Sequence, residues 1–122
     1  MKISLDDMDE SLVIRGYGPG EVAVGRQRYT SSLLVTPDGV VPDWGPNRVA
    51  EITARHLLDI LSYRPELLIL GTGERQDFPS PRLFTDLMDA RVGYEVMATP
   101  AACRTYNILL SEGRRVVAAL LL

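Results

Sequence analysis

The sequence is poor in cysteine, histidine and lysine, and each scarcity excludes a class of function. Cys103 is the only cysteine, so no disulfide can form within the chain and a reducing compartment is permitted. His56 is the only histidine, and one histidine with one cysteine is too small a ligand set for a metal site. Lys2 is the only lysine, and the formal net charge of −3 provides no basic field to hold nucleic acid. We therefore expect no metal, no cofactor and no nucleic-acid partner.

Long apolar runs are also absent. The first ten residues, MKISLDDMDE, lack the apolar region of a signal peptide and are acidic where a transit peptide is basic. The final VVAALLL is too short to span a bilayer. We therefore expect a cytoplasmic protein without membrane insertion. The 122 residues, 46% of them hydrophobic, fit one domain that covers residues 1–122.

The sequence pattern of the first half of the chain predicts short strands separated by turns. Strand-like segments occupy Ser11–Tyr17, Val22–Val24 and Tyr29–Thr36, and the TPDG sequence at Thr36–Gly39 is typical of a tight turn. From Asn47 to about Ser62, apolar residues recur at helical spacing, and Asn47 can cap the start of that helix.

The second half alternates strand and helix. The continuous apolar runs at Leu67–Leu70 and Val116–Leu122 predict strands buried on both faces, with the YEVMA strand at 94–98 between them. Two helices separate these strands, and each begins at a hydroxyl residue followed by proline, at Ser80 and at Thr99. The first helix is expected to bury Leu83, Phe84, Leu87 and Met88, and Gly113 can end the second. This series predicts an α/β fold with helices on the faces of a sheet and an additional N-terminal β portion.

Gly71, Thr72 and Gly73 lie where a buried strand ends, which is where α/β proteins bind ligands. A dinucleotide motif would need a third glycine where Gln76 stands, and a phosphate loop would need a lysine. The favoured interpretation is a tight exit from the strand, with a positive φ at one of the two glycines.

The thiol of Cys103 and the carboxylate of Glu95 are the other candidate ligand-binding groups, together with Glu74. Cys103 falls near a helix start beside Arg104, yet it shares an apolar stripe with Tyr106 and is expected to be buried and unreactive. It could act as a nucleophile only if the fold brings His56 to it, and a packed histidine is the better interpretation.

Glu95 interrupts an apolar strand. If that strand is central, the carboxylate is at least half buried and needs an ion-pair partner, Arg104 or Arg75, although acid–base catalysis with Asp43, Glu74 or Asp77 stays open. Trp44, the only tryptophan, can either anchor a protein interface or cap one end of the core.

Three stretches together resemble a known family: LLVTPDGVVPDW, LLILGTGERQ and YEVMATPAACRTYNILLSEGRRVVAALL. The chain from about Ile3 to Leu122 is similar to the domain-of-unknown-function 498 family. The residues that carry the resemblance most specifically are Glu95, Met97, Thr99, Ala102, Thr105, Tyr106, Asn107, Glu112, Gly113 and Arg114.

The resemblance implies a three-layer α/β fold with a central mixed sheet. Members of the family include a mitochondrial factor for assembly of respiratory complex I and a vertebrate adipogenesis-associated protein, and the family has no established catalytic residues. This chain resembles a stand-alone bacterial-type member.

Two hypotheses follow. The first is a non-catalytic protein-interaction or assembly module whose interface includes Trp44 and Arg75 in the strand-end loops. In this hypothesis a homo-oligomer is also possible. The second is a small-molecule-binding protein or enzyme with a cleft at the strand ends near Gly71–Gly73, Glu95 and Cys103. A concave pocket where those side chains converge favours the second, and a flat apolar patch favours the first.

Overall fold

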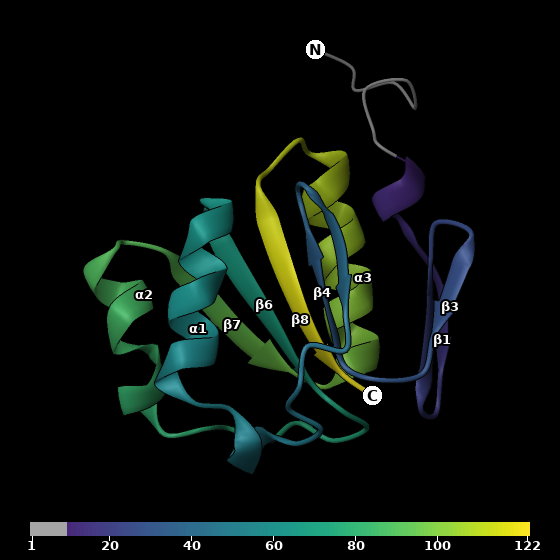
Figure 1. Ribbon diagram of the computed structural model, residues 1–122. Helices are drawn as coiled ribbons and strands as arrows, with labels where there is room; N and C mark the ends of the chain where they lie inside the picture. Colours follow the sequence, from purple (N-terminus) through teal and green to yellow (C-terminus); the bar gives the residue numbers. More distant parts are fainter. Residues whose placement is uncertain (1–9) are drawn as a thin grey trace.

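The computed structural model describes residues 10–122 and shows an α/β fold (Figure 1). Residues 1–9 of the expected domain lie outside the described part. Among the described residues, eight strands form two sheets, and three α-helices and several 3-10 turns connect them. The strands are β1 (Ile14–Gly18), β2 (Glu21–Val24), β3 (Gln27–Tyr29), β4 (Leu33–Thr36), β5 (Gly39–Pro42), β6 (Leu67–Thr72), β7 (Gly93–Met97) and β8 (Val116–Leu121). The helices are α1 (Ala54–Ile60), α2 (Thr85–Asp89) and α3 (Thr99–Ser111).

The central sheet has the strand order β5-β4-β8-β6-β7 and is mixed. Strands β6, β7 and β8 are parallel, whereas β4 joins β8 antiparallel and forms a hairpin with β5. Every residue of β8 is buried, as the continuous apolar run predicts for a strand covered on both faces. The expected mixed sheet, covering helices and N-terminal β portion are therefore all confirmed.

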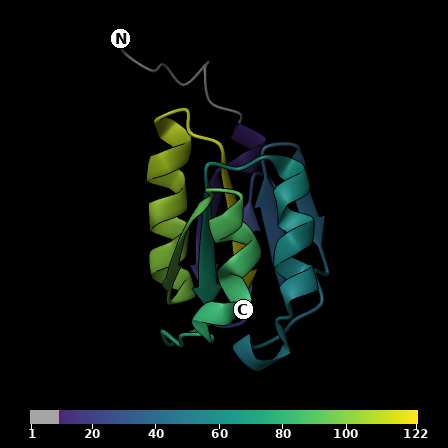
Figure 2. The same cartoon turned by 90° about the vertical axis from the view of Figure 1, so that its left-hand side faces the viewer.

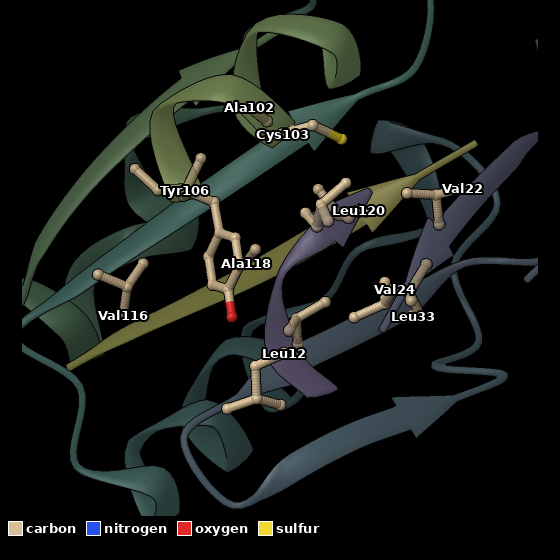
Figure 3. Packing of buried hydrophobic residues seen from close by; sticks show 13 residues of the cluster. Leu12, Val22, Val24, Leu33, Ala102, Cys103, Tyr106, Val116, Ala118 and Leu120 are labelled. Carbon is tan, nitrogen blue, oxygen red and sulfur yellow. The ribbon is translucent and has the colours of Figure 1, made fainter. Parts of the chain in front are cut away.

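The central sheet separates two hydrophobic cores. Helices α1 and α2 cover one face, and α3 covers the other together with the three-stranded sheet β1-β2-β3 (Figures 1 and 2). Side chains from α3 and the small sheet meet over β8 in the second of these cores (Figure 3). Asn107 ties the two layers together, because its side-chain amide donates to the Ile14 carbonyl at 2.7 Å and accepts from the Ile14 amide at 2.9 Å.

Several expected element boundaries are wrong. The segment Tyr29–Thr36 is not one strand, because Tyr29 is the last residue of β3 and Leu33 is the first residue of β4, which belongs to a different sheet. The helix expected from Asn47 begins only at Ala54, because Ile52 is extended and Thr53 forms a capping box with His56. Before it, residues 49–51 form a separate 3-10 turn.

Two further details of the helices differ from expectation. Ser80 does accept a hydrogen bond from the Arg82 amide, but the next turn is a 3-10 helix and α2 is short. Met88 is exposed and does not belong to the buried stripe. Thr99 is the first residue of α3 and Ala98 is its N-cap, so the Thr99 hydroxyl has a different task. Gly113, with a φ of 76°, follows the end of α3 as predicted.

Candidate functional site

Gly71, near the end of β6, and Gly73, just after it, are required for two different reasons. Gly73 has a φ of 96°, a conformation that favours glycine, which confirms the predicted strand exit. Gly71 has no positive φ, but a Cβ built on it would lie 2.8 Å from the Thr99 hydroxyl and 3.1 Å from Ala102 Cβ. Gly71 therefore lets α3 approach the sheet closely, and Gly73 lets the chain turn after the strand.

Thr99 joins this exit to α3 and to β8. Its hydroxyl accepts from the Gly73 amide at 2.8 Å and donates to the Leu121 carbonyl, and its own amide donates to the Gly73 carbonyl at 2.8 Å. Thr72 closes the loop in the same way, donating to the Arg75 carbonyl and accepting from the Asp77 amide at 3.1 Å. The Gly73 and Asp77 amides and the Thr72 and Thr99 hydroxyls are thus used in holding the loop together, and are not free to bind a phosphate.

An apolar pocket of about 260 Å³ lies at the carboxyl ends of the parallel strands. At this end of the sheet the connections leave toward opposite faces, because β6 leads to α2 on one face and β7 leads to α3 on the other. Ligand clefts of α/β proteins lie at positions of this kind. Arg104 donates a 2.7 Å hydrogen bond to the Tyr17 hydroxyl and fixes the β1–β2 hairpin beside it. The lining residues are Tyr17, Gly18, Pro19, Gly20, Gly73, Glu74, Thr99, Pro100 and Leu122.

This strand-end pocket brings together only two of the predicted ligand-binding residues, Gly73 and Glu74. Gly71, Thr72, Glu95 and Cys103 do not line it. Sequence reasoning missed its other wall, the Tyr17–Gly20 hairpin tip, because nothing in the sequence places that turn beside the start of α3.

Cys103 lies in the core with 1% of its surface exposed (Figure 3). Burial raises the pKa of its thiol to about 11, and the nearby Arg104 offsets only part of that rise. His56 lies on the opposite face of the sheet, on α1, where its ring meets Trp44 edge-on at 5.5 Å. The fold therefore forms no Cys–His pair, and Cys103 is buried as predicted.

Glu95 is not buried, because β7 is an edge strand and not a central one. The expected ion pair with Arg104 or Arg75 does not form, and the carboxylate faces solvent. Trp44 is half buried at the end of the core beneath α1 and α2, and Arg75 is exposed in the loop after β6. No group of three or more potential metal ligands occurs among residues 10–122.

A second hollow, which sequence reasoning missed, borders the open edge of β7. It has a volume of about 470 Å³ and is lined by Phe78, Pro79, Pro81, Phe84, Tyr94 and Val96. Phe84 and Tyr94 stack with their ring centroids 4.0 Å apart, so the floor of this β7 groove is rigid and apolar. Phe78 stands at its rim with 68% of its surface exposed, the largest exposed fraction among the large hydrophobic side chains described. The sequence did offer one signal of this hollow, because Phe78 is a large apolar residue that stands alone among polar residues and prolines.

Together, the mixed sheet and the two layers that cover it define a small α/β protein. The chain belongs to the DUF498/DUF598 family of proteins of unknown function, whose model matches residues 14–121.

Three relatives illustrate the range of the family. The chain is 34% identical over 117 residues to a 13 kDa major membrane protein of Francisella tularensis subsp. holarctica, covering 95% of each chain. It is 30% identical to NADH dehydrogenase (ubiquinone) 1 alpha subcomplex assembly factor 3 of Xenopus tropicalis, and the match covers 94% of this chain but 63% of the frog protein. A crystal structure from Bordetella parapertussis superposes with a TM-score of 0.83 at 43% identity, covering 89% of this chain and 93% of that one. No helix in the described part of this chain is long and apolar enough to cross a membrane.

Proposed function

We propose that the protein works without catalysis, by binding another protein during assembly of a membrane-associated respiratory complex. The observation that carries this proposal is the β7 groove. A large aromatic side chain exposed at the rim of an apolar hollow is typical of the centre of a protein interface, where buried aromatic anchors supply most of the affinity.

The chemistry of the described residues supports binding over reaction. The thiol is buried with its pKa raised, the only histidine packs against Trp44, and Glu95 stands alone at a sheet edge. A reaction mechanism needs a nucleophile, a base and a stabilising group within reach of one another, and these groups are spread over both faces of the sheet.

The pathway comes from the relatives. Several vertebrate relatives are named as assembly factors of NADH dehydrogenase, and one bacterial relative is named a membrane protein. A partner that resides in the membrane would account for both names. Because this chain spans about 63% of the frog assembly factor, the partner and the complex are part of the proposal.

Deleting the gene and measuring assembled NADH dehydrogenase tests this proposal. We expect the assembled complex and its activity to fall, and normal complex in the deletion strain would contradict the proposal. Re-expression of Phe78→Ala should restore assembly less well than Ile108→Ala, a matched control whose side chain is 58% exposed on α3, away from the groove.

The strand-end pocket favours a second function, binding of a small apolar molecule. Native mass spectrometry of protein purified from its own cells tests it. A bound molecule at one per chain that is lost in Tyr17→Ala would favour this function, and a protein that carries no added mass would contradict it.

A further inference from the structure

We infer that the partner adds a short extended segment, apolar at its centre and basic around it, to the open edge of β7. This inference rests on the proposed function and specifies the partner's chemistry. Three independent features of the β7 region carry it: unpaired backbone groups, the apolar groove beside them, and unpaired charges around both.

The backbone of β7 has one free side. In a parallel pair, alternate residues direct both their amide and their carbonyl to the same neighbour. Gly93 donates to the Glu66 carbonyl at 3.1 Å, and the register pairs Gly93 with Leu67, so residues 93, 95 and 97 bond toward β6. Tyr94 and Val96 therefore direct their amides and carbonyls away from the sheet, where a further strand would lie.

One of these outward groups is already used. The side-chain amide of Gln76 donates to the Val96 carbonyl at 3.1 Å, as the backbone amide of an added strand would. The Gln76 contact marks one end of the open edge and leaves the Tyr94 amide, the Tyr94 carbonyl and the Val96 amide available. An added segment is therefore short, and most of its affinity comes from side chains.

The groove supplies the place for such a side chain. Tyr94 and Val96, whose backbone groups face outward, also line the β7 groove, with Phe78 at the rim. A segment that pairs with this edge would place alternate side chains over the groove, because side chains alternate between the two faces of a strand. Recognition of this kind combines main-chain hydrogen bonds with a pocket for an apolar side chain.

The charges around β7 have no partners within the described chain. The segment from Glu74 to Glu95 contains five carboxylates and three guanidinium groups, a net charge of −2. None of them takes part in the five ion pairs among the described residues, all of which lie outside this segment. The unpaired groups are Glu74, Arg75, Asp77, Arg82, Asp86, Asp89, Arg91 and Glu95.

The negative net charge of this segment indicates which kind of partner can bind the edge of β7. A second copy of the chain, pairing edge to edge, would bring two segments of net charge −2 together, and like charges across an interface oppose association. A basic segment would instead fill the groove with the apolar side chains on one of its faces, while the basic side chains on its other face lie on the side of β7 that carries Glu95, and Asp77 adds a carboxylate beside Phe78. The observations therefore favour a basic partner over self-association.

The test uses an acetylated heptapeptide, Arg-Val-Lys-Phe-Arg-Val-Lys, as the probe, and the acidic counterpart Glu-Val-Asp-Phe-Glu-Val-Asp as its control. Amide NMR spectra of the full chain are recorded as each peptide is added. We expect the basic peptide to shift and protect the Tyr94 and Val96 amides and the acidic peptide to leave them unchanged. Equal binding of both peptides, shifts confined to the strand-end pocket, or a concentration-dependent dimer that protects the same amides without peptide would each overturn the inference.

Two variants separate backbone pairing from unfolding. Val96→Pro removes an outward amide without touching the bonds to β6, as proline is tolerated on edge strands, and Val96→Thr keeps both the amide and the shape. We expect Val96→Pro to weaken the basic peptide by about tenfold or more and Val96→Thr by much less, with both variants folded, since main-chain bonds supply part of the affinity in strand addition. The pair Asp77→Lys and Glu95→Lys should reverse the preference between the peptides, and an unchanged preference would contradict the charge assignment.

The cell experiment keeps the two proposals distinguishable. If the deletion strain fails to assemble NADH dehydrogenase but a folded Val96→Pro chain restores it fully, strand addition is wrong and the assembly function stands. If the deletion strain assembles the complex normally, the assembly function fails, and the peptide experiment still decides whether β7 accepts a basic strand.

Discussion

Replacing Gly71 with alanine should destabilise the protein by overpacking, although alanine is normally the better residue in ordered backbone. The new methyl group would lie 2.8 Å from the Thr99 hydroxyl and 3.1 Å from both Ala102 Cβ and Leu120 Cδ2. None of these neighbours can yield freely. Thr99 holds Gly73 and Leu121 through hydrogen bonds, and Ala102 is fixed in α3.

The expected loss follows from the cost of one extra methyl group in a packed core, about 1–3 kcal/mol. With an unfolding entropy of about 2.1 cal/mol/K per residue, a chain of this length loses about 4 °C of melting temperature per kcal/mol. A loss near the middle of the range therefore lowers the midpoint by about 8 °C.

Gly16→Ala is the matched control. Gly16 is also a strand glycine without a positive φ, and a Cβ built on it meets nothing within 4 Å. Thermal unfolding followed by circular dichroism should show the control at or above the wild-type midpoint. The reasoning is refuted if Gly71→Ala melts within about 2 °C of the control, since a packing cost of this kind corresponds to a larger shift.

Four further outcomes are expected. Ile69→Asp should abolish the cooperative transition, because the side chain is fully buried in β6 and an unpaired charge there costs several kcal/mol; melting within a few degrees of wild type would show that the site is not a closed core. Cys103 should react with a thiol reagent only at the rate at which the fold opens, and rapid labelling below neutral pH would contradict its burial. The folded pKa of the Cys103 thiol, about 11, exceeds its ordinary 9.0, so its contribution to stability is complete below about pH 9 and is lost as the pH rises through 11. Cys103→Ala should therefore lose less free energy of unfolding between pH 9 and 11 than the wild type. Identical slopes of unfolding free energy against pH in the two proteins would contradict the raised pKa. Asn107→Leu should cost about 2 kcal/mol or more and raise hydrogen exchange in β1 and β2, since both backbone groups of Ile14 lose their partner; unchanged exchange there would show that α3 does not hold the small sheet through this residue.

The strongest sequence signals proved to be those in which burial alone determines the structure. Strands β6 and β8 could be predicted because a continuous apolar run bounded by turns has few alternatives when both faces are covered. The burial of Cys103 followed from the same kind of reasoning, since its stripe on α3 includes Tyr106.

The errors arose where the outcome depends on neighbours distant in sequence. The segment Tyr29–Thr36 looks like one strand, and only the existence of two sheets shows that the chain leaves one at Tyr29 and enters the other at Leu33. Glu95 could be placed only by knowing that β7 is an edge strand, which depends on the strand order and not on its own sequence.

The candidate site was predicted in part for the same reason. Gly73 and Glu74 could be found from a strand exit, but the hairpin wall opposite them comes from residues more than fifty positions earlier. The β7 groove escaped notice because Phe78 belongs to no periodic pattern, and periodicity is what sequence reasoning detects best.

The position of β8 in the sheet also governs how the protein can be made. Its neighbours are β4 from the first half of the chain and β6 from the second, and β8 follows both of them in the sequence. Until Val116–Leu121 emerges from the ribosome, the strand that lies between β4 and β6 in the sheet is missing, so each of the two exposes an unpaired edge. Neither half can complete a core by itself, and folding is therefore a late, single event for which a nascent chain would benefit from a chaperone.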